Sequence, residues 1–410
     1  MANTRREMSS ADDERQQKLK KDVVSSILRK REQPNNLREL GVTTLRNLPA
    51  NVGMVQNLMK AVNWQLAQQE VIENLNNTVV IVGQPNTGKS TLFNTLKGKV
   101  LSPASALAGN TRTLVRTDFG PFTLVDTPGH LPDVMESGME QASVIVFLID
   151  GSKGLRAEDR ELYKAIKRLG KPTIVAVNKV DELKSGGDVF ATEVAVALDV
   201  PGVIPISAKT GENVAEELIP VIIEASPEAA LAIGRELPAF RREAAQRIIR
   251  NAMLLSLAAG LEPIPFIDIP ILLGTQIRLV LRLATLYGEQ MDSADAKKHA
   301  RELIATIAGG LGLRYVAQQA AKAVPFGGDF VAGAIAAGAT WSIGQVAQEY
   351  YEGNKQLNPQ RLQQLYSQFY KRFRRENKVK ALQEQAQKEF SDPVALIEEP
   401  QPKILEEGKA

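Results

Sequence analysis

Between residues 77 and 225, short apolar runs alternate with polar stretches that have a helical period. The apolar runs are rich in Val, Ile and Thr, which favour strands, whereas stretches such as 157–169 are typical of amphipathic helices. This alternation predicts an α/β fold with a mostly parallel sheet and crossover helices. The strands are predicted at residues 78–82, 122–125, 144–149, 173–177 and 202–206.

The segments on either side of this α/β region have helical patterns. Residues 1–76 are polar with apolar positions near a 3.6-residue period, which predicts an N-terminal helical extension. Residues 226–237 form a predicted linker, and residues 238–352 are rich in Ala, Gly, Leu and Ile, which predicts an all-α, Gly/Ala-rich domain. Residues 353–410 are polar again, with a charged helix followed by a disordered tail. The α/β domain itself covers residues 77–225.

Composition fits a folded protein of about two to three domains and excludes several kinds of chemistry. Hydrophobic residues make up 44% of the 410 residues and charged residues 24%, an ordinary globular balance. The chain has no cysteine and only two histidines, which excludes disulfides and thiolate sites and argues against a multi-histidine metal site. A net charge of +3 does not by itself indicate nucleic acid, and residues 1–21 lack the apolar core of a secretory signal.

Residues 83–90 have the sequence Gly-Gln-Pro-Asn-Thr-Gly-Lys-Ser, which fits the phosphate-loop pattern G-x-x-x-x-G-K-[ST]. Gly83 and Gly88 allow the backbone to wrap around a phosphate, while the loop amides and the following helix direct positive dipoles toward it. Lys89 would reach the β- and γ-phosphates, and the Ser90 hydroxyl would bind Mg²⁺. The alternative is a plain glycine-rich turn, but the strand and helix on either side favour a phosphate site. The predicted nucleotide contacts here are Gly83, Pro85, Asn86, Thr87, Gly88, Lys89, Ser90 and Thr91.

Two further segments follow predicted strands and decide between ATP and GTP. Asp126-Thr127-Pro128-Gly129 could hold Mg²⁺ through the Asp126 carboxylate and meet the γ-phosphate with the Gly129 amide. Asp181 ends the tetrapeptide Asn-Lys-Val-Asp and could accept hydrogen bonds from the N1–H and the exocyclic amine of guanine. Adenine lacks this pair of donors, so a carboxylate in this place would discriminate strongly for guanine.

The remaining base contacts come from the same tetrapeptide and from a segment after the last predicted strand. Asn178 would brace the loop and the base, and the stem of Lys179 would lie over the base plane. Ser207, Ala208 and Lys209 would offer backbone amides to the guanine carbonyl. An Asn-Lys-x-Asp tetrapeptide alone is more often a turn, so the prediction of GTP depends on the order and the strand-end placement of all four segments.

With these motifs, residues 77–225 resemble a translation-factor-class G domain, most closely that of the bacterial Era/TrmE-like GTPases. The resemblance implies the three-layer P-loop GTPase sandwich, hydrolysis of GTP to GDP and phosphate, and Mg²⁺ as cofactor. The switch I threonine of the family corresponds to Thr111, which would bind Mg²⁺ together with Ser90 and Asp126. The family commonly has an aspartate where this chain has Thr113, and Thr113 is therefore the alternative to Thr111.

Two residues carry further implications of this resemblance. In potassium-activated members, an asparagine at the position of Asn86 binds a K⁺ ion that stabilises charge between the β- and γ-phosphates; otherwise Asn86 only shapes the loop. Translational GTPases have a histidine at the position of His130, which would orient the attacking water, whereas Era/TrmE-like members act without it. The candidate catalytic residues are Lys89, Thr111, Gly129 and His130.

The apolar region after the linker has two interpretations. Residues 263–273 and 303–313 are apolar, and residues 330–348 have the length but not the hydropathy of a spanning helix. Small residues in the last segment suit a packed membrane hairpin and equally a tight soluble bundle. Residues 255–350 resemble the hydrophobic domain of unknown function that follows the G domain in membrane-associated bacterial, notably cyanobacterial, GTPases, and this favours a membrane.

Two functions follow from these features. The first is a GTP-dependent switch on the cytoplasmic side of a membrane, peripheral or inserted as a hairpin, with a membrane or membrane protein as partner. Basic residues within 371–380 could meet anionic headgroups, and they suit RNA phosphates or an ordinary helix face equally well. The second is a cytoplasmic Era-like GTPase that acts in ribosome or RNA assembly. A homodimer of G domains is a further candidate, and a dynamin-like role would need a longer stalk.

Overall fold

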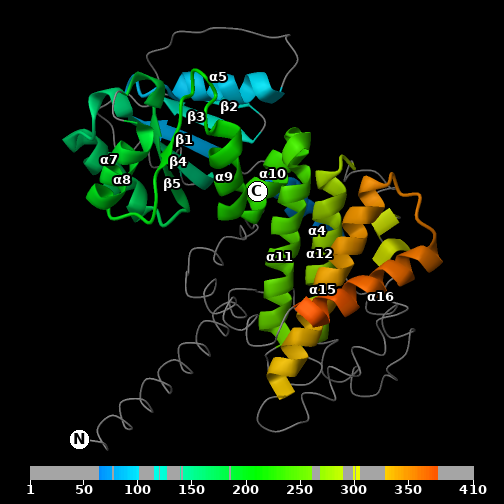
Figure 1. Ribbon diagram of the computed structural model, residues 1–410. Helices are drawn as coiled ribbons and strands as arrows, with labels where there is room; N and C mark the ends of the chain where they lie inside the picture. Colours follow the sequence, from blue (N-terminus) through cyan, green and yellow to red (C-terminus); the bar gives the residue numbers. More distant parts are fainter. Residues whose placement is uncertain are drawn as a thin grey trace, which may run out of the picture.

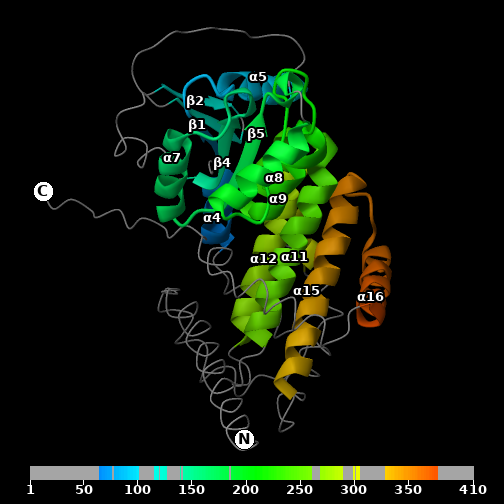
Figure 2. The ribbon, with the colours of Figure 1, turned by 60° about the vertical axis from the view of Figure 1, so that its left-hand side comes forward.

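The computed structural model consists of an α/β domain and a helical domain (Figure 1). The sheet and its helices lie at one end of the molecule, and long helices packed side by side form the other end (Figures 1 and 2). The structure describes residues 64–75, 78–100, 115–119, 121–126, 139, 142–183, 186–260, 268–289, 299–300, 302–304 and 328–376.

The sheet of the α/β domain is made of β1 (Thr78–Gly83), β2 (Val115–Phe119), β3 (Phe122–Asp126), β4 (Ala142–Asp150), β5 (Thr173–Asn178) and β6 (Ile204–Pro205). These six strands have the order β2-β3-β1-β4-β5-β6. β2 runs antiparallel to β3, and every other neighbouring pair is parallel. The central strand β4 is buried along its whole length, as expected for a parallel strand covered on both faces.

Helices cover both faces of this sheet: α5 (Lys89–Val100), α7 (Ala157–Arg168), α8 (Gly187–Leu198) and α9 (Ile219–Ala225). Val79 and Ile81 of β1 point into a core that includes α5 and α9, whereas Val80 and Val82 point into a core with α7 and α8. Successive side chains of a strand face opposite ways, so an uninterrupted apolar run is needed to fill both cores. The predicted three-layer α/β sandwich with a mostly parallel sheet is confirmed.

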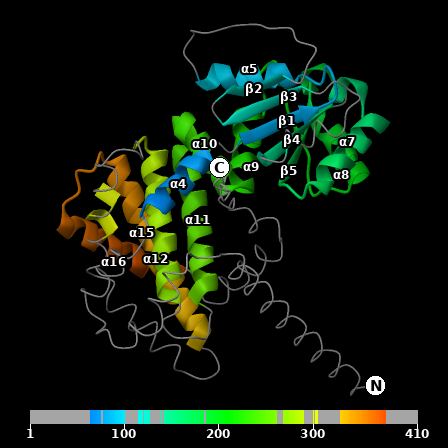
Figure 3. The same cartoon turned by 180° about the vertical axis from the view of Figure 1, so that it is seen from behind.

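The helical domain consists of α4 (Trp64–Leu75), α10 (Pro227–Glu236), α11 (Arg241–Gly260), α12 (Asp268–Leu286), α15 (Gly328–Glu352) and α16 (Pro359–Glu376). α11, α12 and α15 pack against one another, and α16 lies on the outer side of α15 (Figures 1 and 2). α4 precedes the sheet in the chain but packs against α12 and α10 (Figure 3). The predicted helical C-terminal region is confirmed in the described part, and an upstream helix belongs to the same bundle.

The stretch 226–237, predicted as a linker, contains a buried helix. The Ser226 hydroxyl accepts hydrogen bonds from the amides of Glu228 and Ala229 and so caps α10. Residues 227–234 are all buried, and α10 contacts α4, α9, α11, α12 and the strands β1 and β4. One continuous apolar core therefore runs from one face of the sheet through α10 into the helical domain.

α15 contains residues 330–348, the segment that suits either a membrane hairpin or a tight bundle. Its glycines allow close approach: a Cβ at Gly344 would lie 2.7 Å from Cγ1 of Ile249 on α11, and a Cβ at Gly338 would lie 2.8 Å from Cδ1 of Phe373 on α16. Most described apolar side chains of α15 are buried within the helical domain, while Ala334, Ile335 and Trp341 are half-buried, so packing accounts for its Gly/Ala-rich composition. Within the described ranges, no helix combines the length and hydropathy needed to cross a membrane.

Several predicted features fall outside the described residues. They include most of the N-terminal extension, most of the apolar segment 303–313 and the chain after residue 376. Of the predicted charged helix, the structure describes α16, which packs on α15 through Leu362, Tyr366 and Phe373 and exposes its polar side chains.

Candidate nucleotide-binding site

The loop between β1 and α5 contains the predicted phosphate-binding residues. Asn86 and Gly88 both have left-handed backbone conformations, with φ values of 66° and 92°. A Cβ at Gly88 would lie 2.2 Å from Nδ2 of Asn178, and a Cβ at Gly83 would lie 2.3 Å from the carbonyl oxygen of Leu148. A side chain at either Gly83 or Gly88 would therefore clash with a neighbouring segment. Gly88 also has a left-handed backbone conformation that favours glycine.

Lys89 crosses the loop and holds its start in place. Its Nζ donates hydrogen bonds to the carbonyl oxygens of Gly83 (3.0 Å) and Gln84 (3.1 Å), and only 4% of the residue is exposed. The Thr87 hydroxyl donates to the same Gln84 carbonyl at 2.9 Å, and the Gln84 side chain donates to the carbonyl of Glu158 at 3.0 Å. The loop is thus organised around a buried ammonium group at the N-terminus of a helix, an arrangement suited to a phosphate.

Asn178 connects this loop to the segment after β6. Its side chain is buried, Nδ2 donates to the carbonyl of Thr87 at 2.8 Å, and Oδ1 accepts from the amide of Ala208 at 2.8 Å. Thr95 on α5 adds a second connection, because its hydroxyl donates to the Ala208 carbonyl at 2.5 Å. The phosphate loop, the Asn-Lys-x-Asp segment and the segment after β6 therefore meet at the carboxyl ends of parallel strands, where ligands of α/β sheets bind.

Lys179 and Asp181 follow β5 on a short turn. Asp181 lies on a 3-10 turn, η3 (Val180–Glu182), and is exposed, so its carboxylate is accessible to a ligand. Lys179 has a φ of 66°, and its Nζ donates to Oδ2 of Asp150 at 2.7 Å. The structure thus exposes the carboxylate predicted to select guanine on the turn after β5, three residues beyond Asn178.

Asp150, the last residue of β4, is a site residue that no sequence motif singled out. Its side chain is 1% exposed, and it accepts hydrogen bonds from the Ser152 amide (3.1 Å) and hydroxyl (2.6 Å) as well as from Lys179. Burial alone would raise the pKa of Asp150, but the hydrogen bonds from Lys179 and Ser152 outweigh it and hold the pKa below the usual 3.8. The sequence feature that could have identified Asp150 is an acidic residue at the end of an apolar strand, which is also the position of Asp126.

Of the predicted Mg²⁺ ligands, the structure describes Ser90 and the backbone of Asp126. Ser90 is exposed in the first turn of α5, and Asp126 is the last residue of β3. β3 pairs with β1 so that Leu124 lies opposite Ile81, which places the end of β3 beside the phosphate loop. Hydroxyl and carboxylate oxygens are ligands that Mg²⁺ prefers, so the residue types at these positions fit the ion. The predicted residues of this part that fall outside the described ranges are Thr111, Thr113, Gly129 and His130.

The other predicted contacts surround this site. Pro85 and Thr91 are exposed on the loop and the first turn of α5. Ser207 is fully buried and its hydroxyl accepts a hydrogen bond from the amide of Thr210 at 3.2 Å, which stabilises the turn after β6. Lys209 is exposed on that turn. The Ala208 amide donates to Asn178 and the Ser207 amide donates to the Glu212 carbonyl at 3.2 Å, so these two of the three amides predicted to contact guanine are engaged within the protein.

Comparison with known proteins agrees with this geometry. Residues 78–179 match the family described as 50S ribosome-binding GTPase, and residues 226–375 match a domain of unknown function, DUF697. GTPase Era of Aquifex aeolicus (strain VF5) is 35% identical over 171 residues, covering 37% of this chain and 56% of that protein. GTPase Der of Clostridium botulinum (strain Hall) is 39% identical over 127 residues, covering 27% of this chain and 29% of that protein. The chain thus spans about half, or less, of the length of these relatives.

Among solved structures, the alignment with a probable GTP-binding protein, engB, covers 34% of this chain and 93% of the engB chain, with 26% identity and a TM-score of 0.28. Translation elongation factor SelB from Methanococcus maripaludis, in its apo form, covers 34% of this chain with 24% identity and a TM-score of 0.25. Both of these curated relatives, Era and Der, are named as GTPases. Residues 78–179 are therefore similar to the P-loop GTPase domains of Era and Der, and residues 226–375 match the DUF697 family.

Proposed function

We propose that this chain binds GTP with Mg²⁺ and hydrolyses it to GDP and phosphate. The observation that carries the proposal is the junction at Asn178, because it ties the phosphate loop to the segments predicted to select the base. Asp181 is exposed beside this junction, where its carboxylate would pair with the N1–H and exocyclic amine of guanine. The identity to GTPase Era and GTPase Der over the same part of the chain supports this activity.

In this proposal the protein acts by positioning and electrostatic stabilisation, as in phosphoryl transfer generally. The loop amides and the N-terminus of α5 would bind the phosphates, and Lys89 would exchange its bonds to loop carbonyls for bonds to phosphate oxygens. Ser90, Asp126 and Thr111 would hold Mg²⁺, which when bound neutralises charge that develops on the phosphates. Asn86 would hold K⁺, and Gly129 and His130 would complete the γ-phosphate site.

The test is nucleotide hydrolysis by the purified full chain, with one lysine changed in the site and one outside it. The wild type should release phosphate from GTP and not from ATP, and Lys89→Ala should abolish tight GTP binding and hydrolysis. Lys164→Ala is the matched control, because Lys164 is exposed on α7 and pairs only with the exposed Glu161 in the described contacts. Equal binding of ATP and GTP by the wild type would refute the assignment of the base-reading segment.

We further propose that the helical domain is the output of a nucleotide-dependent switch bound peripherally to the cytoplasmic side of a membrane. Support comes from α16, whose last turns expose Lys371, Arg372, Arg374 and Arg375, with Glu376 as the acidic residue among them. Such a cluster suits anionic headgroups. Peripheral binding rather than insertion is proposed because most described apolar side chains of α15 are already buried within the bundle.

Action on ribosomes or RNA is the second candidate, and it is favoured by the family description that residues 78–179 match. Fractionation of the native protein separates the two. Membranes would be washed with high salt, alkaline carbonate and detergent: release by salt supports peripheral binding, and release only by detergent indicates insertion. Arg374→Glu/Arg375→Glu should abolish salt-sensitive binding, whereas the matched charge reversal Lys164→Glu/Lys167→Glu on α7 should not. Sedimentation with ribosomes instead of membranes would support the second candidate.

A further inference from the structure

We propose that Asp150 is a positioning residue for the nucleotide base: it anchors the ammonium of Lys179, so that the methylene stem of this lysine forms a fixed wall of the guanine site. The inference rests on the proposed GTP binding and adds a residue on which that binding depends. Asp150 lies outside the sequence motifs of the site, and its role is inferred from its contacts.

Both oxygens of the Asp150 carboxylate are engaged. Oδ1 accepts from the amide and the hydroxyl of Ser152, at 3.1 Å and 2.6 Å, and Oδ2 accepts from Nζ of Lys179 at 2.7 Å. The residue is 1% exposed, at the end of the central strand β4, and lies opposite Asn178 in the pairing of β4 with β5. A carboxylate held at both oxygens on a rigid strand offers the lysine one fixed attachment point.

The backbone of Lys179 is itself in an uncommon conformation. Its φ and ψ of 66° and 35° are left-handed, which a residue with a long side chain seldom adopts. The neighbouring loops hold it there, because the Val180 amide donates to the carbonyl of Ile206 at 3.3 Å. A Cβ at Gly151 would lie 2.9 Å from the Asn178 carbonyl oxygen, so the turn after β4 packs directly on the turn after β5. Lys179 is therefore fixed at its backbone by these turns and at its ammonium by Asp150.

A side chain that is fixed at both ends has already lost its rotamer freedom when the protein folds. A free lysine would lose this freedom when a purine packs against its stem, and the loss would weaken nucleotide binding. The anchored stem lies two residues before Asp181, the carboxylate proposed to read the base edge. Asp150 thus supplies preorganisation of the site and makes no contact with the nucleotide itself.

A purely structural ion pair between two turns is the competing explanation, and Lys153 provides a control for it. Nζ of Lys153 lies 3.7 Å from the same Oδ2 of Asp150, and its side chain is 45% exposed. Removing Lys153 takes a positive charge from the same carboxylate but leaves Lys179 anchored. If nucleotide binding depended only on positive charge near Asp150, replacing either lysine would weaken it. The proposed role predicts that only replacement of Lys179 weakens nucleotide binding.

The experiment measures the affinity of the full chain for GDP with Mg²⁺ by calorimetry, together with kcat and KM for GTP. We expect Asp150→Asn and Lys179→Met each to weaken GDP binding by up to about tenfold, the order of the cost of immobilising one long side chain on binding. Lys179→Met keeps an apolar stem of similar length and removes only the anchored charge. The double variant Asp150→Asn/Lys179→Met should bind GDP no more weakly than Lys179→Met alone, because each change breaks the same contact between Asp150 and Lys179. Lys153→Met should bind as the wild type does.

The kinetic readout separates positioning from chemistry and from stability. Asp150→Asn should raise KM and leave kcat unchanged, because the base contact is made equally in ground and transition states. Wild-type GDP affinity in Asp150→Asn or Lys179→Met, additive losses in the double variant, or a lowered melting temperature with unchanged affinity would each overturn the proposal. If Asp150→Asn does not fold, the comparison of Lys179→Met with Lys153→Met decides alone. Failure of the wild type to bind any guanine nucleotide would instead overturn the proposed function.

Discussion

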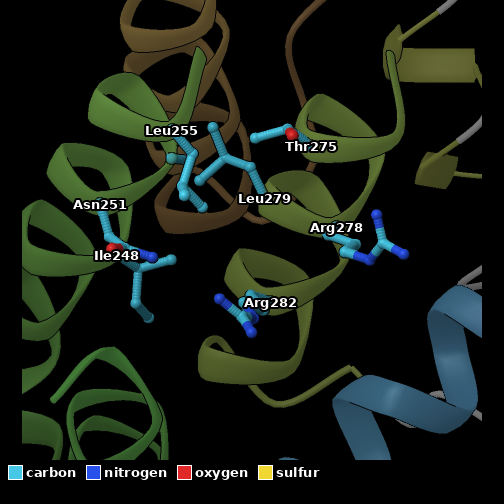
Figure 4. Close-up of a pocket in the computed structure, with 8 residues that line it drawn as sticks. Ile248, Asn251, Leu255, Thr275, Arg278, Leu279 and Arg282 are labelled. Atoms are coloured by element: carbon cyan, nitrogen blue, oxygen red, sulfur yellow. The ribbon is translucent and has the colours of Figure 1, made fainter. Parts of the chain in front are cut away.

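Arg282 on α12 and Glu228 on α10 form a buried ion pair whose disruption should be costly. Oε1 of Glu228 lies 3.4 Å from Nη2 of Arg282, and each side chain is 8% exposed. The other carboxylate oxygen of Glu228 is engaged by the Ser226 hydroxyl at 2.8 Å. Figure 4 shows Arg282 and Arg278 one turn apart on α12, with Arg278 extending toward α4. Replacing Arg282 by Met would leave the Glu228 carboxylate buried without this counter-charge.

We expect Arg282→Met to lower the free energy of unfolding by about 3 kcal/mol. Removal of one partner of a buried ion pair costs roughly 3–5 kcal/mol, because the remaining charge stays desolvated. The lower end applies here, since the two atoms are 3.4 Å apart and Ser226 still donates to the carboxylate. The double variant Arg282→Met/Glu228→Gln also removes the negative charge of the Glu228 carboxylate, so it should be more stable than Arg282→Met alone.

The matched control is Arg278→Met, one turn away on the same helix. Arg278 pairs with Glu70 of α4 through two hydrogen bonds, at 2.5 Å and 3.2 Å, but both side chains are 24% exposed, so solvent screens the interaction and the expected cost is about 1 kcal/mol or less. Urea unfolding followed by far-ultraviolet circular dichroism measures all three variants. A cost for Arg282→Met below about 1 kcal/mol, or one no larger than that of Arg278→Met, would refute the reasoning from burial.

Four further predictions concern single positions. Asp181→Asn should shift preference from GDP to xanthosine diphosphate, because the carboxylate acceptor becomes an amide; competition binding that still favours GDP would contradict this. Gly88→Ala should abolish nucleotide binding in a chain that remains folded by circular dichroism, because a Cβ there would lie 2.2 Å from Nδ2 of Asn178. Gly344→Val should destabilise the helical domain by roughly 1–3 kcal/mol in thermal unfolding, because it overpacks the contact with Ile249. The lowered pKa of Asp150 gives a stabilisation that is complete above the unfolded value near 3.8 and is lost as pH falls through the folded value; acid titration of Asp150→Asn should lack this loss.

Five of the six strands and the phosphate loop were predictable because local physics determines them, whereas the antiparallel edge strand β2 was not predicted. A strand that is buried on both faces needs an unbroken apolar run, and β4 shows this along its whole length. The glycines of the loop meet backbone constraints that no other residue satisfies, with a φ of 92° at Gly88. The bracing role predicted for Asn178 corresponds to its two hydrogen bonds, because the topology of a parallel sheet brings the strand ends together.

Features that depend on distant partners were not predictable. Residues 226–237 begin with Ser-Pro, which can start either a linker or a helix. α10 is a buried helix because the sheet packs on one side of it and α12 on the other. The pair of Glu70 with Arg278 joins residues far apart in the chain, so no local pattern places α4 in the helical domain. In α15, small residues permit close packing in lipid or in a bundle, and the neighbours α11 and α16 decide which occurs.

The route from the nucleotide site to the helical domain follows from how the two domains are joined. α4 leads into β1, whose other end is the phosphate loop, and α9 leads directly into the buried helix α10. At this junction, Glu70, Glu224 and Glu228 on the elements next to the sheet pair with arginines on α11 and α12. The shared apolar core and these ion pairs leave no flexible linker between the domains in the described chain. In the proposed switch, a displacement of β1 or α9 on GTP hydrolysis would therefore be transmitted to α11 and α12, which is the physical reason for proposing the helical domain as its output.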